Sequence, residues 1–144
     1  MRELISDSAE TTIGIAKEFC AGLSSASGPQ IVLLVGDLGA GKTTFMKGVG
    51  EYFGIKEDIT SPTFVIERIY DIPDGSFKRL VHIDAYRLEK EEELRTIGWE
   101  RYSSDPGNII FIEWPANMRI ELLGAKKIEF FHQDETTRKI IFHD

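Results

Sequence analysis

Residues 36–43 read GDLGAGKT, which matches the pattern G-x-x-x-x-G-K-[ST] in full. Glycine lets the backbone turn closely enough for consecutive N–H groups to point at phosphate oxygens, and a following helix adds partial positive charge. We therefore expect nucleoside triphosphate here, with Lys42 at the outer phosphates and the Thr43 hydroxyl on magnesium. The expected nucleotide contacts are Asp37, Leu38, Gly39, Ala40, Gly41, Lys42, Thr43 and Thr44.

Two carboxylates each end an apolar run further along the chain, Asp84 in HIDAYRL and Glu113 in FIEW. Ligands of parallel sheets bind at the carboxyl ends of the strands, so both acids should face the loop if all three strands run parallel. Phosphoryl transfer needs a metal and a positioned nucleophile. One acid could hold magnesium while the other orients the attacking water, and spacing alone does not assign these roles.

Three further features have more than one interpretation. The segment SPTF (residues 61–64) lies where switch proteins sense the terminal phosphate, although an ordinary turn into a strand explains it equally well. His82 interrupts an apolar strand, and we interpret it as a packed histidine rather than a base. Trp114 is either a core residue or a pocket wall.

The surrounding pattern predicts an α/β fold, a single P-loop domain over residues 1–144. We expect a mixed, mainly parallel sheet flanked by helices, with a C-terminal antiparallel hairpin. Strands are predicted at 2–5, 30–35, the end of 60–72, 78–88, 108–114, 126–133 and 138–144, and helices at 6–23, 42–53 and 89–102. In the first helix, Asp7 and Glu10 fit a capping box. Its predicted buried face comprises Ile13, Ala16, Cys20 and Leu23.

Composition narrows the possible functions. The 144 residues carry 24 acidic and 17 basic side chains, a formal net charge of −7. Proteins that grip nucleic acid directly usually show a basic face, so strong direct binding is not expected. The one cysteine excludes an intramolecular disulfide and favours a reducing cytoplasm. We expect a cytoplasmic protein, because neither a membrane-spanning stretch nor a signal-peptide core is present.

Four motifs in this order, GDLGAGKTTF, SPTF, HIDAYRL and IEWP, resemble the TsaE family of bacterial tRNA threonylcarbamoyladenosine biosynthesis ATPases. SAETT is similar to the S-x-E-x-T signature of that family, and the resemblance runs from about Ser8 to Pro115. It implies ATP and Mg²⁺ as cofactors and slow hydrolysis by the chain alone. It also implies two partner proteins, with which threonylcarbamoyl is installed on an adenosine beside the anticodon. The tRNA would then be held mainly by those partners.

The resemblance also implies roles for single residues. Lys42 and Thr43 would hold phosphate and magnesium. Glu113 would be the second carboxylate at the magnesium, and Asp84 the acid needed for hydrolysis. It implies that Ser8, Glu10 and Thr11 lie near the adenine and that Trp114 lies near the nucleotide. Thr63 would be part of the phosphate-sensing segment SPTF.

A low intrinsic rate also follows from the sequence, which has no obvious arginine beside the phosphate loop; Arg87 is the nearest candidate. An arginine that stabilises charge is worth orders of magnitude in phosphoryl transfer. We hypothesise that complex formation orders SPTF or supplies a missing group.

Three alternative functions share the same loop. A small-molecule kinase is one, and DAYR resembles the Asp/Arg pairs with which some kinases grip substrates. A GTP-dependent switch is disfavoured because the chain has no Asn-Lys-x-Asp element. The third is a nucleotide-dependent binding module in which ATP is only a structural ligand.

Overall fold

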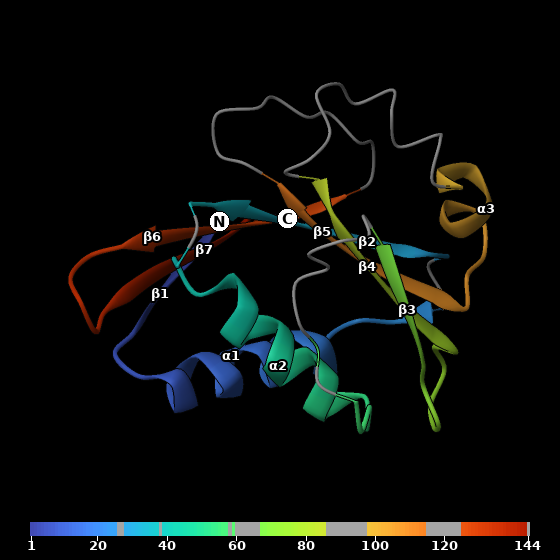
Figure 1. Cartoon of the computed structure of the whole chain (residues 1–144), viewed down its shortest axis with the longest axis horizontal. Helices are drawn as coiled ribbons and strands as arrows, with labels where there is room; N and C mark the ends of the chain where they lie inside the picture. The colour runs from blue at the N-terminus through green and yellow to red at the C-terminus, as the bar shows by residue number, and fades with distance from the viewer. Residues whose placement is uncertain are drawn as a thin grey trace.

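A seven-stranded sheet with the order β1-β7-β6-β2-β5-β4-β3 forms the centre of the molecule (Figure 1). The computed structural model describes residues 1–25, 28–37, 39–57, 59, 67–85, 98–114 and 125–143. The strands are β1 (Arg2–Ser6), β2 (Gln30–Gly36), β3 (Glu67–Asp71), β4 (Arg79–Asp84), β5 (Asn108–Trp114), β6 (Lys126–His132) and β7 (Arg138–His143). The helices are α1 (Ala9–Ala21), α2 (Lys42–Tyr52) and α3 (Trp99–Ser103).

The central strands of the sheet are parallel and its outer pairs are antiparallel. β2 runs parallel to β5 and β6, and β5 runs parallel to β4. β1–β7, β6–β7 and β3–β4 are antiparallel, two of them joined directly as hairpins. The predicted C-terminal hairpin is therefore confirmed, whereas a mainly parallel sheet is wrong, since the described strands are evenly mixed. The requirement that β2, β4 and β5 be parallel is confirmed.

Apolar side chains are buried on both faces of the sheet. Helices α1 and α2 lie side by side on one face (Figure 1), where Phe45 of α2 belongs to the same buried apolar cluster as Leu34 and Phe111 of the strands. On the other face, Leu33 and Ile110 belong to a second apolar cluster, against which α3 packs. The continuous apolar runs of β2 and β5 follow from this arrangement, because alternate residues must be buried on opposite faces.

Helix α1 begins one residue later than the predicted capping box requires. Its N-cap is Ser8, whose Oγ accepts a hydrogen bond from the backbone N–H of Thr11 over 3.1 Å. Asp7 accepts instead from the Thr11 hydroxyl over 3.3 Å, so the box with Asp7 as cap is wrong. The buried residues of the helix are Thr12, Ile15, Ala16 and Cys20, so the predicted face is correct only in part. Burial raises the pKa of the Cys20 thiol to about 12, as expected for a packed residue.

Gly48 allows α1 and α2 to approach closely. A Cβ at this position would lie 2.7 Å from the Ala16 Cβ and 2.8 Å from the Ile13 carbonyl oxygen. We expect Gly48→Ala to lower the free energy of unfolding by roughly 1–3 kcal/mol, because overpacking outweighs the gain in helix propensity. Urea unfolding measures this, with Gly14→Ala as the control.

Gly14 is the matched position because it also lies within a helix but has no heavy atom within 4 Å of an added Cβ. Its replacement should raise the free energy of unfolding by up to about 1 kcal/mol through helix propensity alone. If Gly48→Ala raised stability by the same amount as Gly14→Ala, close packing between the helices would be refuted.

Some sequence predictions lie outside the described residues. They are the SPTF segment with Thr63, Leu38, Arg87 and most of the helix predicted at 89–102. Helix α3 overlaps the last residues of that predicted helix. Within the described ranges, none of the helices has the length and apolar character that crossing a membrane requires.

Candidate nucleotide site

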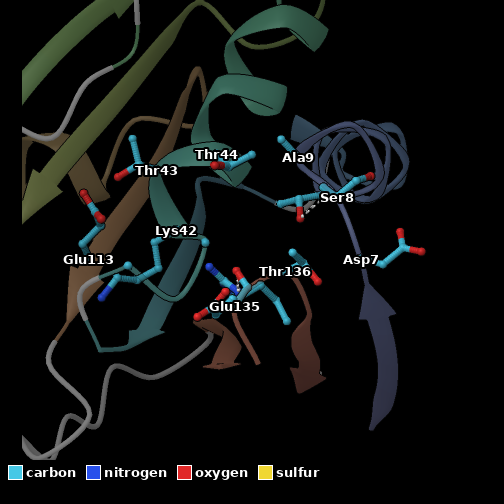
Figure 2. Close-up of a pocket in the computed structure, with 13 residues that line it drawn as sticks. Asp7, Ser8, Ala9, Lys42, Thr43, Thr44, Glu113, Glu135 and Thr136 are labelled. Atoms are coloured by element: carbon cyan, nitrogen blue, oxygen red, sulfur yellow. Dashed lines mark hydrogen bonds between the residues drawn. The ribbon is translucent and has the colours of Figure 1, made fainter. Parts of the chain in front are cut away.

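A cavity of about 380 Å³ opens at the carboxyl end of β2, beside the phosphate loop (Figure 2). Its lining comes from the start of α1, the loop, the first turn of α2, the end of β5 and the β6–β7 turn. The lining residues are Asp7, Ser8, Ala9, Thr12, Gly39, Gly41, Lys42, Thr43, Thr44, Glu113, Glu135, Thr136 and Arg138.

Strand pairing brings these distant segments together. β6 runs parallel to β2, with Gly36 opposite Phe130, so the turn that follows β6 lies at the same edge as the loop that follows β2. β1 runs antiparallel to β7, and its last residue, Ser6, pairs with Arg138 at the start of β7. The start of α1 and the β6–β7 turn therefore both lie beside the phosphate loop (Figure 2).

Two glycines of the loop are required by its geometry. A Cβ on Gly36 would lie 2.7 Å from the Phe130 carbonyl oxygen, so a side chain would separate the loop from β6. Gly41 is the N-cap of α2 and has a φ of 109°, a left-handed conformation that other residues rarely adopt. Because glycine has no side chain, Gly41 does not cap the first backbone N–H groups of α2, and these groups can donate hydrogen bonds to a ligand.

Lys42 is almost completely buried, with 3% of its surface exposed. Its Nζ donates a hydrogen bond to the carbonyl oxygen of Gly36, so the side chain folds back across the loop. Burial lowers the pKa of Lys42, because water no longer solvates the ammonium, while Glu113, Asp37 and Asp84 oppose that shift. The ammonium therefore lies within the electrostatic field of three carboxylates.

Asp84 and Glu113 lie at the same level of the sheet, as the parallel arrangement predicts. They are register partners on β4 and β5. Glu113 is buried and lines the cavity, whereas Asp84 is half-buried. Because side chains alternate along a strand, Asp84 shares a face with Leu80, and Glu113 with Phe111, both in the core beneath α1 and α2.

His82 contacts the candidate site directly, which the sequence interpretation missed. It is buried as expected, with 1% of its side chain exposed, but its Nε2 lies 2.8 Å from Oε2 of Glu113. The two residues come from neighbouring strands and share the face that carries Asp84. Its position two residues before an acid at the end of a strand was the only signal in the sequence.

The structure brings only some of the other predicted contacts to the cavity. Gly39, Thr43 and Thr44 line it, as does Ser8. Glu10 and Thr11, predicted near the adenine, are exposed on the first turn of α1 and are not among the lining residues that the structure describes. Asp37 and Ala40 are sequence neighbours of lining residues but do not line the cavity themselves. Only the backbone of Trp114 is described, and Leu38 lies outside the described residues.

The β6–β7 turn contributes residues that sequence analysis did not identify. Glu135, Thr136 and Arg138 line the cavity, and the Arg138 Cγ lies 3.7 Å from where a Gly41 Cβ would be. An arginine does therefore stand beside the phosphate loop, contrary to the sequence interpretation. No local motif marks it, because the β6–β7 pairing and the β6–β2 pairing together bring it there.

The lining has the donors and acceptors that a magnesium nucleotide needs. A cavity of about 380 Å³ is within the usual range for small-molecule sites, roughly 300–1,000 Å³. Lys42, Arg138 and the start of α2 offer positive charge to phosphates. Magnesium is usually held by one or two protein oxygens plus substrate phosphates, and Thr43 and Glu113 can supply those oxygens.

Comparisons with known proteins agree on one family. Residues 6–140 match the family model described as Threonylcarbamoyl adenosine biosynthesis protein TsaE. The tRNA threonylcarbamoyladenosine biosynthesis protein TsaE of Bacillus subtilis is 42% identical over 120 residues, covering 83% of this chain and 70% of that protein. The protein of that name from Streptomyces coelicolor is 38% identical over 113 residues, covering 77% and 68%. The crystal structure of Bacillus subtilis YdiB superposes with a TM-score of 0.65 and 29% identity, covering 98% and 83%.

Proposed function

The chain belongs to the TsaE family of threonylcarbamoyl adenosine biosynthesis proteins, and on that premise we propose that it is the Mg²⁺-dependent ATPase of tRNA threonylcarbamoyladenosine synthesis. It is weakly active alone and works with two partner proteins in the cytoplasm. The observation that carries this proposal is one cavity lined by Lys42, Thr43 and Glu113 at the start of α2.

The phosphates of ATP bind between the phosphate loop and the first turn of α2. Lys42 neutralises the outer phosphates, and the backbone N–H groups at the start of α2 bind the same oxygens. Thr43 and Glu113 hold magnesium, which when bound neutralises charge on the phosphates. The Asp84 carboxylate, one strand further along the sheet, orients the attacking water.

Ser8 and Thr136 bind the ribose and adenine, whereas Arg138 binds the phosphates. Ser8 and Thr136 face the cavity from the start of α1 and from the β6–β7 turn, on the side away from Glu113 (Figure 2). Arg138 approaches the loop from the start of β7 and now donates to the backbone carbonyls of Asp134 and Thr137. These polar groups give the nucleotide an orientation.

Binding of tRNA falls mainly to the partner proteins. With a formal net charge of −7, this chain is not expected to bind a phosphate backbone strongly by itself. The ATPase acts on the assembly rather than on the RNA.

Phosphate release from ATP by the purified chain tests the proposal, measured alone and with both partner proteins plus tRNA. We expect slow release alone and faster release with the complete set, together with formation of modified adenosine. A rate that partners and tRNA leave unchanged would contradict the proposal. Phosphate appearing on an added metabolite or nucleoside instead of in solution would identify a kinase.

Arg138 provides a further prediction. Arg138→Gln should weaken ATP binding about tenfold, because a hydrogen bond to a charged group is worth roughly 1.5–3 kcal/mol. Arg101, exposed on α3, supplies the control, and Arg101→Gln should leave affinity unchanged. Titration with a fluorescent ATP analogue measures both. Equal ATP affinities for the two variants would show that Arg138 does not bind the nucleotide.

A further inference from the structure

Among the described residues, the side chain of His82 makes one hydrogen bond, and its partner is the carboxylate of Glu113 in the candidate site. Its Nε2 lies 2.8 Å from Glu113 Oε2, and the two side chains are 1% and 5% exposed. Its other ring nitrogen, Nδ1, is buried and has no hydrogen-bond partner in the described part of the chain. The polar interaction that accounts for a histidine at this buried position is therefore the one with Glu113.

We propose that His82 is a positioning residue, which holds the Glu113 carboxylate in the orientation that binds magnesium beside the phosphate loop. This inference rests on the proposed function and assigns a new residue to the same site. An ionised carboxylate can only accept hydrogen bonds, so Nε2 carries the proton and donates it to Oε2. The same hydrogen bond therefore also fixes the orientation of the second carboxylate oxygen, Oε1.

Strand geometry makes this hydrogen bond a rigid one. His82 pairs in register with Phe111 on β5, two residues before Glu113, so the ring reaches diagonally along the shared face. Both strands lie inside the sheet, and β5 has β2 and β4 as neighbours. Donors behind a metal-binding side chain typically change metal affinity 10–100-fold when they are removed.

A purely structural role for His82 is the competing explanation. A buried polar ring costs free energy unless it is hydrogen-bonded, and an aliphatic side chain would fill the same volume in an apolar core without that cost. The test must therefore compare two polar replacements that differ only in reach. The amide nitrogen of glutamine extends to about the position of Nε2, whereas that of asparagine extends only to about Nδ1.

Mg²⁺-dependent ADP binding separates the two explanations. His82→Asn, His82→Gln and the unmodified chain are titrated with fluorescent ADP, with and without Mg²⁺, and each is unfolded in urea. We expect His82→Asn to need about tenfold more Mg²⁺ for half of the full gain in affinity. His82→Gln should stay within about threefold of the unmodified chain, and ADP affinity without Mg²⁺ should be the same in all three.

Each other outcome overturns the proposal. If both variants keep the normal Mg²⁺ requirement, or if both shift it equally, the donated hydrogen bond does not position Glu113. A loss of ADP affinity without Mg²⁺, in step with a loss of stability, assigns His82 a structural role. If ADP binding by the unmodified chain ignores Mg²⁺, the proposed function itself fails, and this proposal with it.

Discussion

Lys42→Met should abolish ATP hydrolysis and weaken nucleotide binding by about 100-fold or more. Hydrogen bonds to charged groups contribute roughly 1.5–3 kcal/mol each, and the three N–H donors of the Lys42 ammonium allow at least two of them with the outer phosphates. Methionine has nearly the same length, so the variant removes the charge without opening a cavity. Lys47→Met, at an exposed position of the same helix, is the control that should bind normally.

The same variant should be at least as stable as the unmodified chain. Burial lowers the pKa of Lys42 below its ordinary 10.5, so the unfolded chain holds this proton over a pH range in which the folded chain has lost it. Unfolding free energy therefore rises with pH through that range, and Lys42→Met should lack this rise. Urea unfolding without nucleotide measures it. A variant that is much less stable would mean that lost binding reflects lost folding.

The lowered pKa also predicts how ATP binding depends on pH. The Lys42 ammonium is lost at a lower pH than that of an ordinary lysine, so affinity should fall as pH rises through the lowered pKa. Titrations at several alkaline pH values, with Lys42→Met as the reference, isolate this contribution. An affinity that is flat in both proteins would show that the ammonium does not bind the nucleotide.

Variants of the two carboxylates should differ in the Mg²⁺ concentration that they require. We expect Glu113→Gln and Asp84→Asn each to lower the rate of phosphate release about 100-fold or more, as loss of a positioned acid or base typically does. Glu113→Gln should also raise the Mg²⁺ requirement, whereas Asp84→Asn should keep it. The reverse pattern would exchange the two roles. If Glu113→Gln kept both nucleotide binding and full tRNA modification, the chain would be a binding module.

Local patterns predicted the parts of the site that are continuous in sequence. The loop, with Lys42 and Thr43, sits between a buried strand and a helix, as its spacing required. Asp84 and Glu113 became register partners because parallel strands align their carboxyl ends. These predictions succeeded since each depends on a few consecutive residues plus one assumption about strand direction.

The missed parts depend on pairings between distant segments. Arg138 reaches the loop only because β6 lies next to β2 and β7 next to β6, and no residue pattern specifies that order. His82 was assigned to the core because it interrupts an apolar strand, and its partner lies 31 residues away on β5. The α1 cap failed for a local reason, since Ser8 competed with Asp7 for the same turn.

The order of strands also decides when a nascent chain can acquire this site. β6 and β7 lie between β1 and β2 in the sheet, so β1 has no neighbour until β7 has left the ribosome. The central strands and α2 can associate earlier, because they follow one another along the chain. A synthesis intermediate that ends before Arg138 would thus contain the whole phosphate loop and both acids but lack Arg138 and the strand that pairs with β1. Full nucleotide affinity should therefore appear only late during translation, once β7 has joined the sheet.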